Sequence, residues 1–476
     1  MFQPVKRFEI CYTVCSCLSA SMAKLRRRIE ERETLERSSV GPVMKQTGSS
    51  SFASSPLEKT KEYWHMLGPG LTTGASDDDP SGIATYSQTG AQYGYQLLWL
   101  AVFTFPLMAV VQEMCARIGL VTGRGLAANI RMHYPRWVLY TCTALLFGAN
   151  AFNIGADLGA MAKGVQLFLP SVSFSLLVVG FTVLCLVLQI FSTYASYARI
   201  LKYLALVLLA YIFSGLSVSV DWKSVLSHAT IPSISFSREQ IFLVCGILGT
   251  TISPYLFFWQ TSQEVEEEIL HGKTSIEARQ QITTPREIKQ MRVDVWSGMF
   301  LSNVVMFFII MTCAATLFTA GITNIDTAAD AVLALKPIAG NAAYLLFAVG
   351  IIGTGLLAVP VLAGSASYAM SESFGWKEGL YRKWQQAHAF YGVIIVSMLV
   401  GLLLNFIGLD PIKALIYSAV ANGIVAPVVL VLIVGLSSNQ KVMGEHVSKP
   451  VTRTLGLIIT SLMAVAGVAT MIALFV

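Results

Sequence analysis

The sequence predicts an all-α polytopic membrane protein that crosses a lipid bilayer about eleven times. Of its 476 residues, 54% are apolar and 13% are charged, and the mean hydropathy is +0.63. Apolar stretches of about 20 residues recur along the chain, and each can cross a hydrocarbon layer of about 30 Å as a helix. The expected spans are residues 66–86, 97–119, 138–168, 173–192, 199–220, 240–268, 293–320, 341–371, 387–408, 411–436 and 452–475.

Residues 1–61 differ in composition from the rest of the chain. They contain a charged run from Lys24 to Arg37 and a serine-rich stretch from Ser49 to Ser55. Segments of this kind cannot bury enough apolar surface to fold. We therefore expect a largely disordered cytoplasmic tail at 1–61 and one membrane domain at 62–476.

The distribution of basic residues predicts the orientation, because cytoplasmic loops retain Lys and Arg. With a cytoplasmic N-terminus, all but five of the 33 basic residues lie in the tail or in loops on the cytoplasmic side. This asymmetry also accounts for the net charge of +6, so we expect a lipid bilayer and no nucleic acid as partner. The plasma membrane of a bacterium is the expected location. The five exceptions are Lys163, Lys223, Arg238, Lys336 and Lys413.

Two of the expected spans are interrupted at their middle by a polar residue followed by proline, Asp79-Pro80 and Ser253-Pro254. Proline removes a backbone donor and clashes with the preceding turn, so each helix should unwind there. Unpaired backbone groups in hydrocarbon cost several kcal/mol each unless they face protein, water or a bound solute. The first break also carries the carboxylates of Asp77, Asp78 and Asp79. The sequence therefore predicts a cation site at the breaks.

The two breaks fall in the first and the sixth span, an odd number of spans apart. Equivalent halves of the chain then have opposite orientations, as in transporters built from inverted repeats with a binding site at the midplane. The first repeat covers about 66–220 and the second about 240–436, with an extra helix at 452–475. This arrangement predicts a secondary transporter of the broken-helix type.

Four short segments resemble the NRAMP family of divalent metal transporters. Gly68–Gly70 and Asp79–Thr85 are similar to its first helix, which carries Asp-Pro-Gly-Asn followed by an aromatic residue, Ala and Thr. Ser253–Tyr255 stands where the family has Met-Pro-His, and Ile154–Asp157 resembles a segment of its third helix with an acidic residue linked to proton movement. The likeness covers roughly 62–436. It implies a LeuT-like fold with five plus five repeated helices and uptake of divalent cations, usually together with protons.

The departures from the family pattern concern the metal ligands. The family binds metal through the Asp and Asn of the first helix and the Met of the sixth; Asp79 persists here, whereas Gly82 and Ser253 take the other two positions. Thioethers select soft metals, and oxygen donors suit Mg²⁺, Mn²⁺ or Ca²⁺. Some relatives of the family that carry Mg²⁺ also lack the methionine. We expect a hard site built from backbone carbonyls and from Asp79, Asp78, Thr250, Ser253 and Tyr255.

Proton coupling is expected to be weak or absent. The two histidines of the family's sixth helix fall at Tyr255 and Gln260, and a second carboxylate of its third helix falls at Ala160. All six histidines of the chain lie near span ends or in loops, so a midplane imidazole relay is missing. An i, i+3, i+7 stripe on the third span could still line a proton or ion pathway. It consists of Asn150, Asn153 and Asp157.

Several polar residues have a structural interpretation as well. Asp77 or Asp78 would lie in the outer vestibule or cap the second half-helix. The proline at Ser253-Pro254 could simply kink a helix, and Asp157 could pair with Lys163. For the others we expect a Glu113–Arg117 pair at i, i+4 and interhelical hydrogen bonds of Asn303 and Asn422. A solvated face is expected for Glu264, Glu266, Glu267 and Glu268, with cation attraction at the inner mouth as the less favoured alternative.

The sequence allows comparison of metal transport with three other functions. In the main alternative, a transporter of the same fold carries an organic cation or amino acid, whose amine pairs with Asp79 beside the aromatic residues Tyr255, Phe257, Phe258 and Trp259. A sensor would bind the same cation without moving it. An enzyme is disfavoured, because the sequence has no nucleophile–base pair, His/Cys metal cluster or phosphate loop. We expect no cofactor besides the transported divalent ion and any proton carried with it. The sequence does not identify protein partners.

Overall fold

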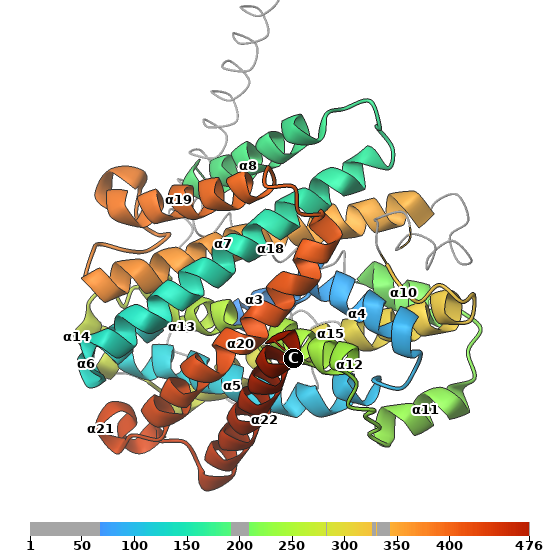
Figure 1. Ribbon diagram of the computed structural model, residues 1–476. Coiled ribbons are helices and arrows are strands. Elements are labelled where there is room, and N and C mark those ends of the chain that lie inside the picture. The colour runs from blue at the N-terminus through green and yellow to red at the C-terminus, as the bar shows by residue number, and fades with distance from the viewer. Residues whose placement is uncertain (1–66, 192–208, 282, 326–329, 331–342, 476) are drawn as a thin grey trace, which may run out of the picture. The chain divides into compact units, whose positions relative to one another are not determined.

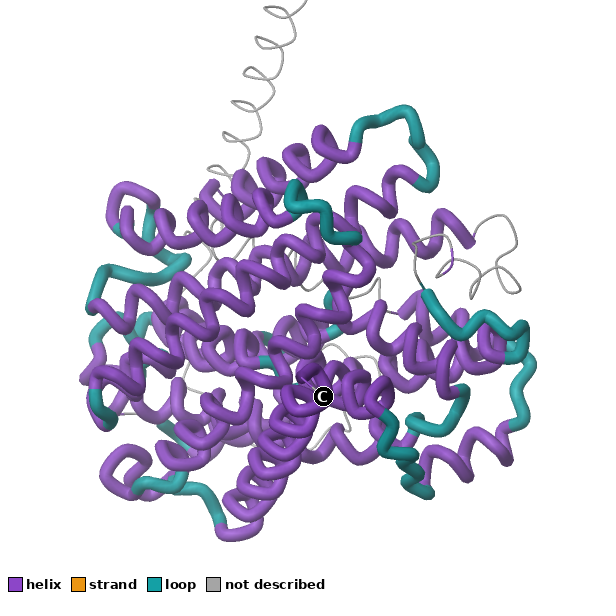
Figure 2. Tube along the Cα trace, viewed as in Figure 1, coloured by secondary structure: helices purple, strands orange, loops and turns teal. Residues whose placement is uncertain are grey.

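The computed structural model describes residues 67–191, 209–281, 283–325, 330 and 343–475. The expected N-terminal tail lies outside these residues, as does the first part of the fifth expected span. The described residues belong to one compact unit that begins at Lys61, and they form helices joined by loops, without strands (Figure 2).

Eight helices or helix pairs of the described chain are long and apolar enough to cross a membrane. They are α5 (Trp99–Thr122), α7 (Arg136–Gln166), α8 (Phe174–Phe191), α12 (Arg238–Thr251) with α13 (Pro254–Leu270), α15 (Pro285–Cys313) with the π-helix η2 (Ala314–Phe318), α18 (Ala343–Phe374), α20 (Pro411–Ser437) and α22 (Pro450–Phe475) (Figure 1). Shorter helices occupy the other expected spans: α3 (Pro69–Asp77) with α4 (Pro80–Tyr93), α10 (Leu209–Ser217) and α19 (His388–Leu404). The prediction of an all-α membrane protein with about eleven spans is confirmed.

The main differences from the prediction lie at helix ends and in connections. Helix α15 begins at Pro285, earlier than expected, because a capping box extends it. In that box the Glu287 amide donates to Thr284 Oγ1 at 3.2 Å, and the Thr284 amide donates to Glu287 Oε2 at 2.7 Å. The short connecting helices were not expected: α6 (Leu126–His133), α11 (Trp222–Thr230), α14 (Ile276–Gln281) and α21 (Gln440–Met443).

Both predicted helix breaks are present. Helix α3 ends at Asp77 and α4 begins at Pro80, so Asp78 and Asp79 form the first break. Asp79 is extended, with φ −67° and ψ 172°, as expected for a residue that precedes proline. Ser253, in the second break between α12 and α13, is extended as well, with φ −82° and ψ 134°. Helix α3 contacts α13 and α4 contacts α12, so the two broken helices lie side by side (Figure 1).

Glycines allow each broken helix to approach a second helix closely. A Cβ atom at Gly74 of α3 would collide with the Gly298 backbone of α15, and one at Gly249 of α12 would collide with the backbone of Ala419 and Gly423 on α20. Small residues at such crossings are typical of helix packing in membranes. Helix α3 is therefore fixed against α15, and α12 against α20.

Two of the predicted polar contacts join helices. Arg117 Nη1 lies 3.6 Å from Glu113 Oε1, and the same oxygen is 2.8 Å from Nη2 of Arg292 on α15, so the predicted pair is extended into a network between α5 and α15. Asn303 accepts a hydrogen bond from Thr104 Oγ1 on α5 at 3.0 Å, as expected. Asn422 differs: its buried Oδ1 has no hydrogen-bond partner in the described part of the chain.

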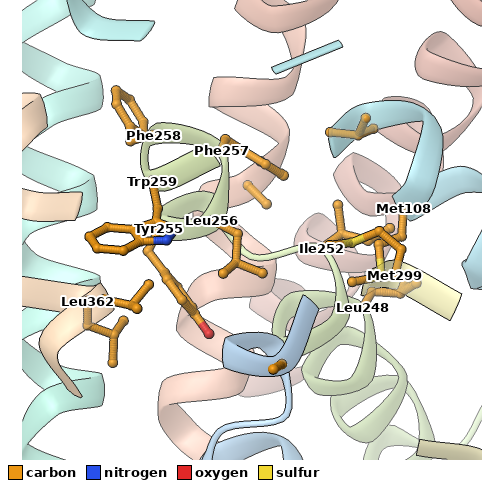
Figure 3. Packing of buried hydrophobic residues seen from close by; sticks show 14 of the residues in the cluster. Met108, Leu248, Ile252, Tyr255, Leu256, Phe257, Phe258, Trp259, Met299 and Leu362 are labelled. Atoms are coloured by element: carbon orange, nitrogen blue, oxygen red, sulfur yellow. The ribbon is translucent and has the colours of Figure 1, made fainter. Parts of the chain in front are cut away.

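The start of α13 forms part of the buried core (Figure 3). Tyr255, Phe257, Phe258 and Trp259 are at most 1% exposed. Phe257 and Phe258 point away from Tyr255 (Figure 3). The four rings therefore do not form the aromatic wall that the organic-cation alternative requires.

Candidate functional site

The first break divides its three aspartates between two sides. Asp79 faces α7, whereas Asp77 contacts α15 through Ser302. All three carboxylates are buried, with exposed fractions of 0% or 1%. The expectation that Asp77 or Asp78 lies in an open vestibule is therefore wrong.

Asp79 is the N-cap of α4. Its Oδ1 accepts hydrogen bonds from the Gly82 amide at 2.7 Å and from Ser81 Oγ at 2.6 Å, which satisfies a free donor of the first turn. The cap thus comes from Asp79, and not from Asp77 or Asp78 as the structural interpretation held. The other carboxylate oxygen, Oδ2, is left to face α7.

On α7, Asn153 connects Asp79 with Asp157. Asn153 Nδ2 donates to Asp79 Oδ2 at 2.7 Å and lies 3.4 Å from Asp157 Oδ2. Asp157 makes no ion pair with Lys163 in the described structure, because the Lys163 ammonium lies 5.4 Å from the centre of the Phe174 ring instead. Two members of the predicted stripe therefore adjoin the break. The third, Asn150, donates to the Leu362 carbonyl of α18 at 2.9 Å.

The second break contributes neutral oxygen atoms. The Ser253 hydroxyl donates to the carbonyls of Gly249 at 2.7 Å and Thr250 at 2.8 Å, which leaves its lone pairs free. Tyr255 donates its hydroxyl proton to the Ser76 carbonyl at 2.8 Å, and so ties α13 to the end of α3 (Figure 3). No positive side chain is among these contacts.

Gly82 marks the place where the two breaks meet. A Cβ atom there would lie 2.9 Å from Thr250 Oγ1 and 3.3 Å from the Asp77 carbonyl oxygen. The Thr250 hydroxyl therefore lies against the glycine that stands at the asparagine position of the NRAMP pattern. Oxygen atoms of Asp79, Thr250 and the Asp77 carbonyl therefore lie close to this glycine.

The donor set favours a hard cation. The described part of the chain contains no group of three or more His, Cys, Asp and Glu side chains placed to hold a metal ion. A cation at the breaks would depend on carboxylate, hydroxyl and carbonyl oxygens together, and on water. This combination suits Mg²⁺, Mn²⁺ or Ca²⁺ better than soft metals.

Asp294 positions α3, a role that the sequence pattern does not reveal. This α15 carboxylate accepts from the amides of Gly68 at 2.8 Å, Gly70 at 2.7 Å and Leu71 at 3.1 Å. Helix α3 has no side-chain cap of its own, so Asp294 satisfies its free N-terminal donors from another helix. In the sequence, Asp294 is marked only as a carboxylate at the edge of an apolar span, a position where charged residues are rare.

The glutamates at the end of α13 are not a solvated face, which corrects the expectation. Glu264, Glu266 and Glu268 are only 6%, 2% and 4% exposed. Glu266 accepts from the Tyr368 hydroxyl at 2.5 Å and from the Leu380 amide at 2.7 Å, so it joins α13 to α18 and to the loop that follows. These carboxylates hold the helix ends together.

The comparisons with known proteins agree with this architecture. The sequence model of the family described as natural resistance-associated macrophage protein-like matches residues 70–473. A manganese transporter of Eremococcus coleocola, solved with an aromatic bis-isothiourea compound, is 18% identical, with a TM-score of 0.69 over 90% of this chain and 89% of that one. A mutant of the same transporter gives 17% identity and the same TM-score of 0.69, over the same 90% and 89%.

A third solved structure has a different cargo. Mhp1, a nucleobase-cation-symport-1 family transporter in a closed conformation with bromovinylhydantoin bound, is 15% identical, with a TM-score of 0.52 over 85% of this chain and 91% of that one. At such identities the likeness shows the fold alone.

The paired breaks and the shared architecture give the chain the fold of the LeuT-like class. The family match spans most of the chain, and the chain belongs to the Nramp family, whose members transport divalent metal ions.

Proposed function

We propose that the protein is a secondary transporter of divalent cations of the Mn²⁺ or Mg²⁺ class that works by alternating access. The cation would bind between the halves of the two broken helices, with Asp79 as its charged ligand. Thr250, Ser253 and the Asp77 carbonyl would add neutral oxygens, and Tyr255 would hold α13 against α3. The observation that carries the proposal is the burial of the Asp79 carboxylate beside the oxygens that meet at Gly82.

The ion class follows from the ligands. In the described part of the breaks no thioether takes the place of the family's methionine, since Ser253 stands there with a hydroxyl. Hard divalent cations bind oxygen and keep part of their water shell, which a mixed set of donors tolerates. Manganese is also the ion named for the E. coleocola transporter of the same fold.

Proton coupling would be weak or absent, since Tyr255 and Gln260 stand where the family carries histidines. Asp157 and Asn153 would offer the one polar route that leads away from Asp79 along α7. The N-terminus would be cytoplasmic and the protein would lie in the plasma membrane, as the distribution of basic residues indicates.

The proposal is tested by uptake of Mn²⁺ and Mg²⁺ into proteoliposomes with the internal pH recorded. Asp79→Asn keeps a side-chain oxygen that can cap α4 but removes the charge. We expect uptake to fall at least about 100-fold, because even partners outside the ligand set cost 10-fold to 100-fold in metal sites. Uptake that persists in this variant would refute the assignment.

Asp410→Asn is the matched control. Asp410 precedes Pro411 and caps α20 by accepting from the Ile412 amide at 2.9 Å, but it is exposed and lies away from the breaks. Both variants change an Asp-Pro helix cap in the same way. A loss of uptake confined to Asp79→Asn therefore reports the charge at the site and not the cap.

A further inference from the structure

The α15 side of the first break holds carboxylate oxygens that no described residue neutralises. Asp77 and Asp78 are each 0% exposed, and three of their four carboxylate oxygens have no hydrogen-bond partner in the described structure. The ion pairs of the described residues involve other acids, namely Glu113, Glu268 and Glu287. A buried carboxylate without a partner costs several kcal/mol. A bound cation would offset that cost.

One hydroxyl group of α15 lies at these carboxylates. Ser302 Oγ donates to Asp77 Oδ2 at 2.8 Å. The other Asp77 oxygen and both oxygens of the adjacent Asp78 are buried without a hydrogen-bond partner among the described residues.

Backbone packing fixes this arrangement. Gly74 of α3 touches the Gly298 backbone of α15, and the two helices run in the same direction from that contact. About one turn further along, Asp77 and Ser302 lie opposite each other. The hydroxyl therefore reaches the carboxylate because the helix backbones are close, and not because a long side chain bends toward it.

The carboxylates of the first break face two sides, and the ion proposed for Asp79 reaches only one of them. Asp79 and Asp157 share Asn153 on the α7 side, where that ion would bind. On the other side, Asp77 Oδ1 and both carboxylate oxygens of Asp78 would remain without a partner among the described residues.

We infer that Asp77, Asp78 and Ser302 form a second binding site, for a hard divalent cation, on the α15 side of the break. Asp78, expected from the sequence to share the Asp79 site, belongs to this second site instead. The inference rests on the proposed function for the first site. Two carboxylates and a hydroxyl supply few oxygens, so the ion keeps several waters, as Mg²⁺ and Mn²⁺ do at sites with one or two carboxylates.

The experiment is an equilibrium titration of the purified full chain with Mn²⁺, in which electron paramagnetic resonance counts the free ion. We expect two Mn²⁺ per chain in the unchanged protein and in Asp410→Asn. Asp78→Asn should bind one, and the double variant Asp78→Asn/Asp79→Asn should bind none. Ser302→Ala keeps both carboxylates, so it should still bind two ions, one of them about 10-fold more weakly.

The outcomes separate this inference from the proposed function. One Mn²⁺ per chain in the unchanged protein, or two in Asp78→Asn, would overturn the second site while leaving Asp79 as the transport ligand. Uptake that persists in Asp79→Asn would overturn the transport assignment instead. Thermal unfolding of each variant checks that it folds, and removal of a buried charge by Asp→Asn should not lower its stability.

Discussion

The two helix breaks have the same backbone geometry and opposite chemistry. The first contains Asp78 and Asp79 beside Asp77, and three of its carboxylate oxygens have no hydrogen-bond partner among the described residues. The second contains Ile252 and Ser253, and the hydroxyl of Ser253 is bonded to carbonyls of its own helix. The first break therefore supplies the carboxylates that attract a cation, and the second break supplies neutral oxygen atoms.

The helices that lead into the breaks differ in a parallel way. Helix α12 is capped by its own Ser237, which accepts from the Gln240 amide at 3.2 Å. Helix α3 depends on Asp294 of α15 for the same purpose. Helix α3 is thus held by the distant helix α15 at its start, through Asp294, and at its end, where Asp77 accepts from Ser302. This difference from α12 can be tested.

Among changes that keep all the carboxylates, the largest effect is expected for Asn153→Ala, which removes the amide between Asp79 and Asp157. The facing oxygens of these two buried carboxylates would then have no donor between them, so Mn²⁺ uptake in proteoliposomes should fall about 10-fold to 100-fold. Asn150→Ala is the control, since Asn150 is on the same helix but bonds to α18. An equal loss of uptake in both variants would mean that uptake depends on the packing of α7 and not on the contact between Asn153 and Asp79.

Next in size is Asp294→Asn, which weakens the cap of α3. An asparagine oxygen still accepts, but the charge is lost and one of the acceptors becomes a donor, so we expect about 1–2 kcal/mol of destabilisation. Thermal unfolding in detergent measures it. Ser237→Ala should cost less, because it removes neutral hydrogen bonds only, those with the Gln240 amide and the Tyr93 hydroxyl. Equal losses would contradict the view that the first break depends more on distant contacts.

A smaller effect is expected for Ser253→Met, which places a thioether in the neutral break. Soft ligands favour transition metals, so the ratio of Mn²⁺ to Mg²⁺ uptake should rise by about 10-fold. Competitive uptake of the two ions measures the ratio. A ratio that stays constant would show that the second break does not set the choice of ion.

The smallest effect is expected for Tyr255→Phe. This change removes one hydrogen bond, to the Ser76 carbonyl, and should lower stability by about 0.5–1.5 kcal/mol while most of the uptake remains. Unfolding and uptake of the same preparation provide the test. If uptake disappears but the protein remains folded, the tyrosine oxygen is itself a ligand.

The sequence predicted the spans and both breaks because each depends on local properties. Apolar length determines which helices cross a membrane, and a polar residue before proline determines where a helix opens. The early start of α15 was not predicted, since the first turns of this helix are charged and do not continue the apolar stretch. The capping box of Thr284 and Glu287 was the signal available there.

The site was predicted less well because its contacts are long-range. The sequence pattern indicated Asp79 and Asn153 as site residues. It could not show that the two are hydrogen-bonded to each other, because they are 74 positions apart in the chain. The part played by Ser302 and Asp294 depends on which helix packs beside α3. The spacing of Gly70 and Gly74 predicts a close helix contact without naming the partner.

The Asp294 cap has a consequence for biosynthesis. Three backbone amides at the start of α3 are satisfied by a residue that is made more than 220 positions later. Until the ribosome has produced α15, these amides lack the carboxylate that caps them. Helix α3 therefore reaches its final hydrogen bonding only after α15 has been made.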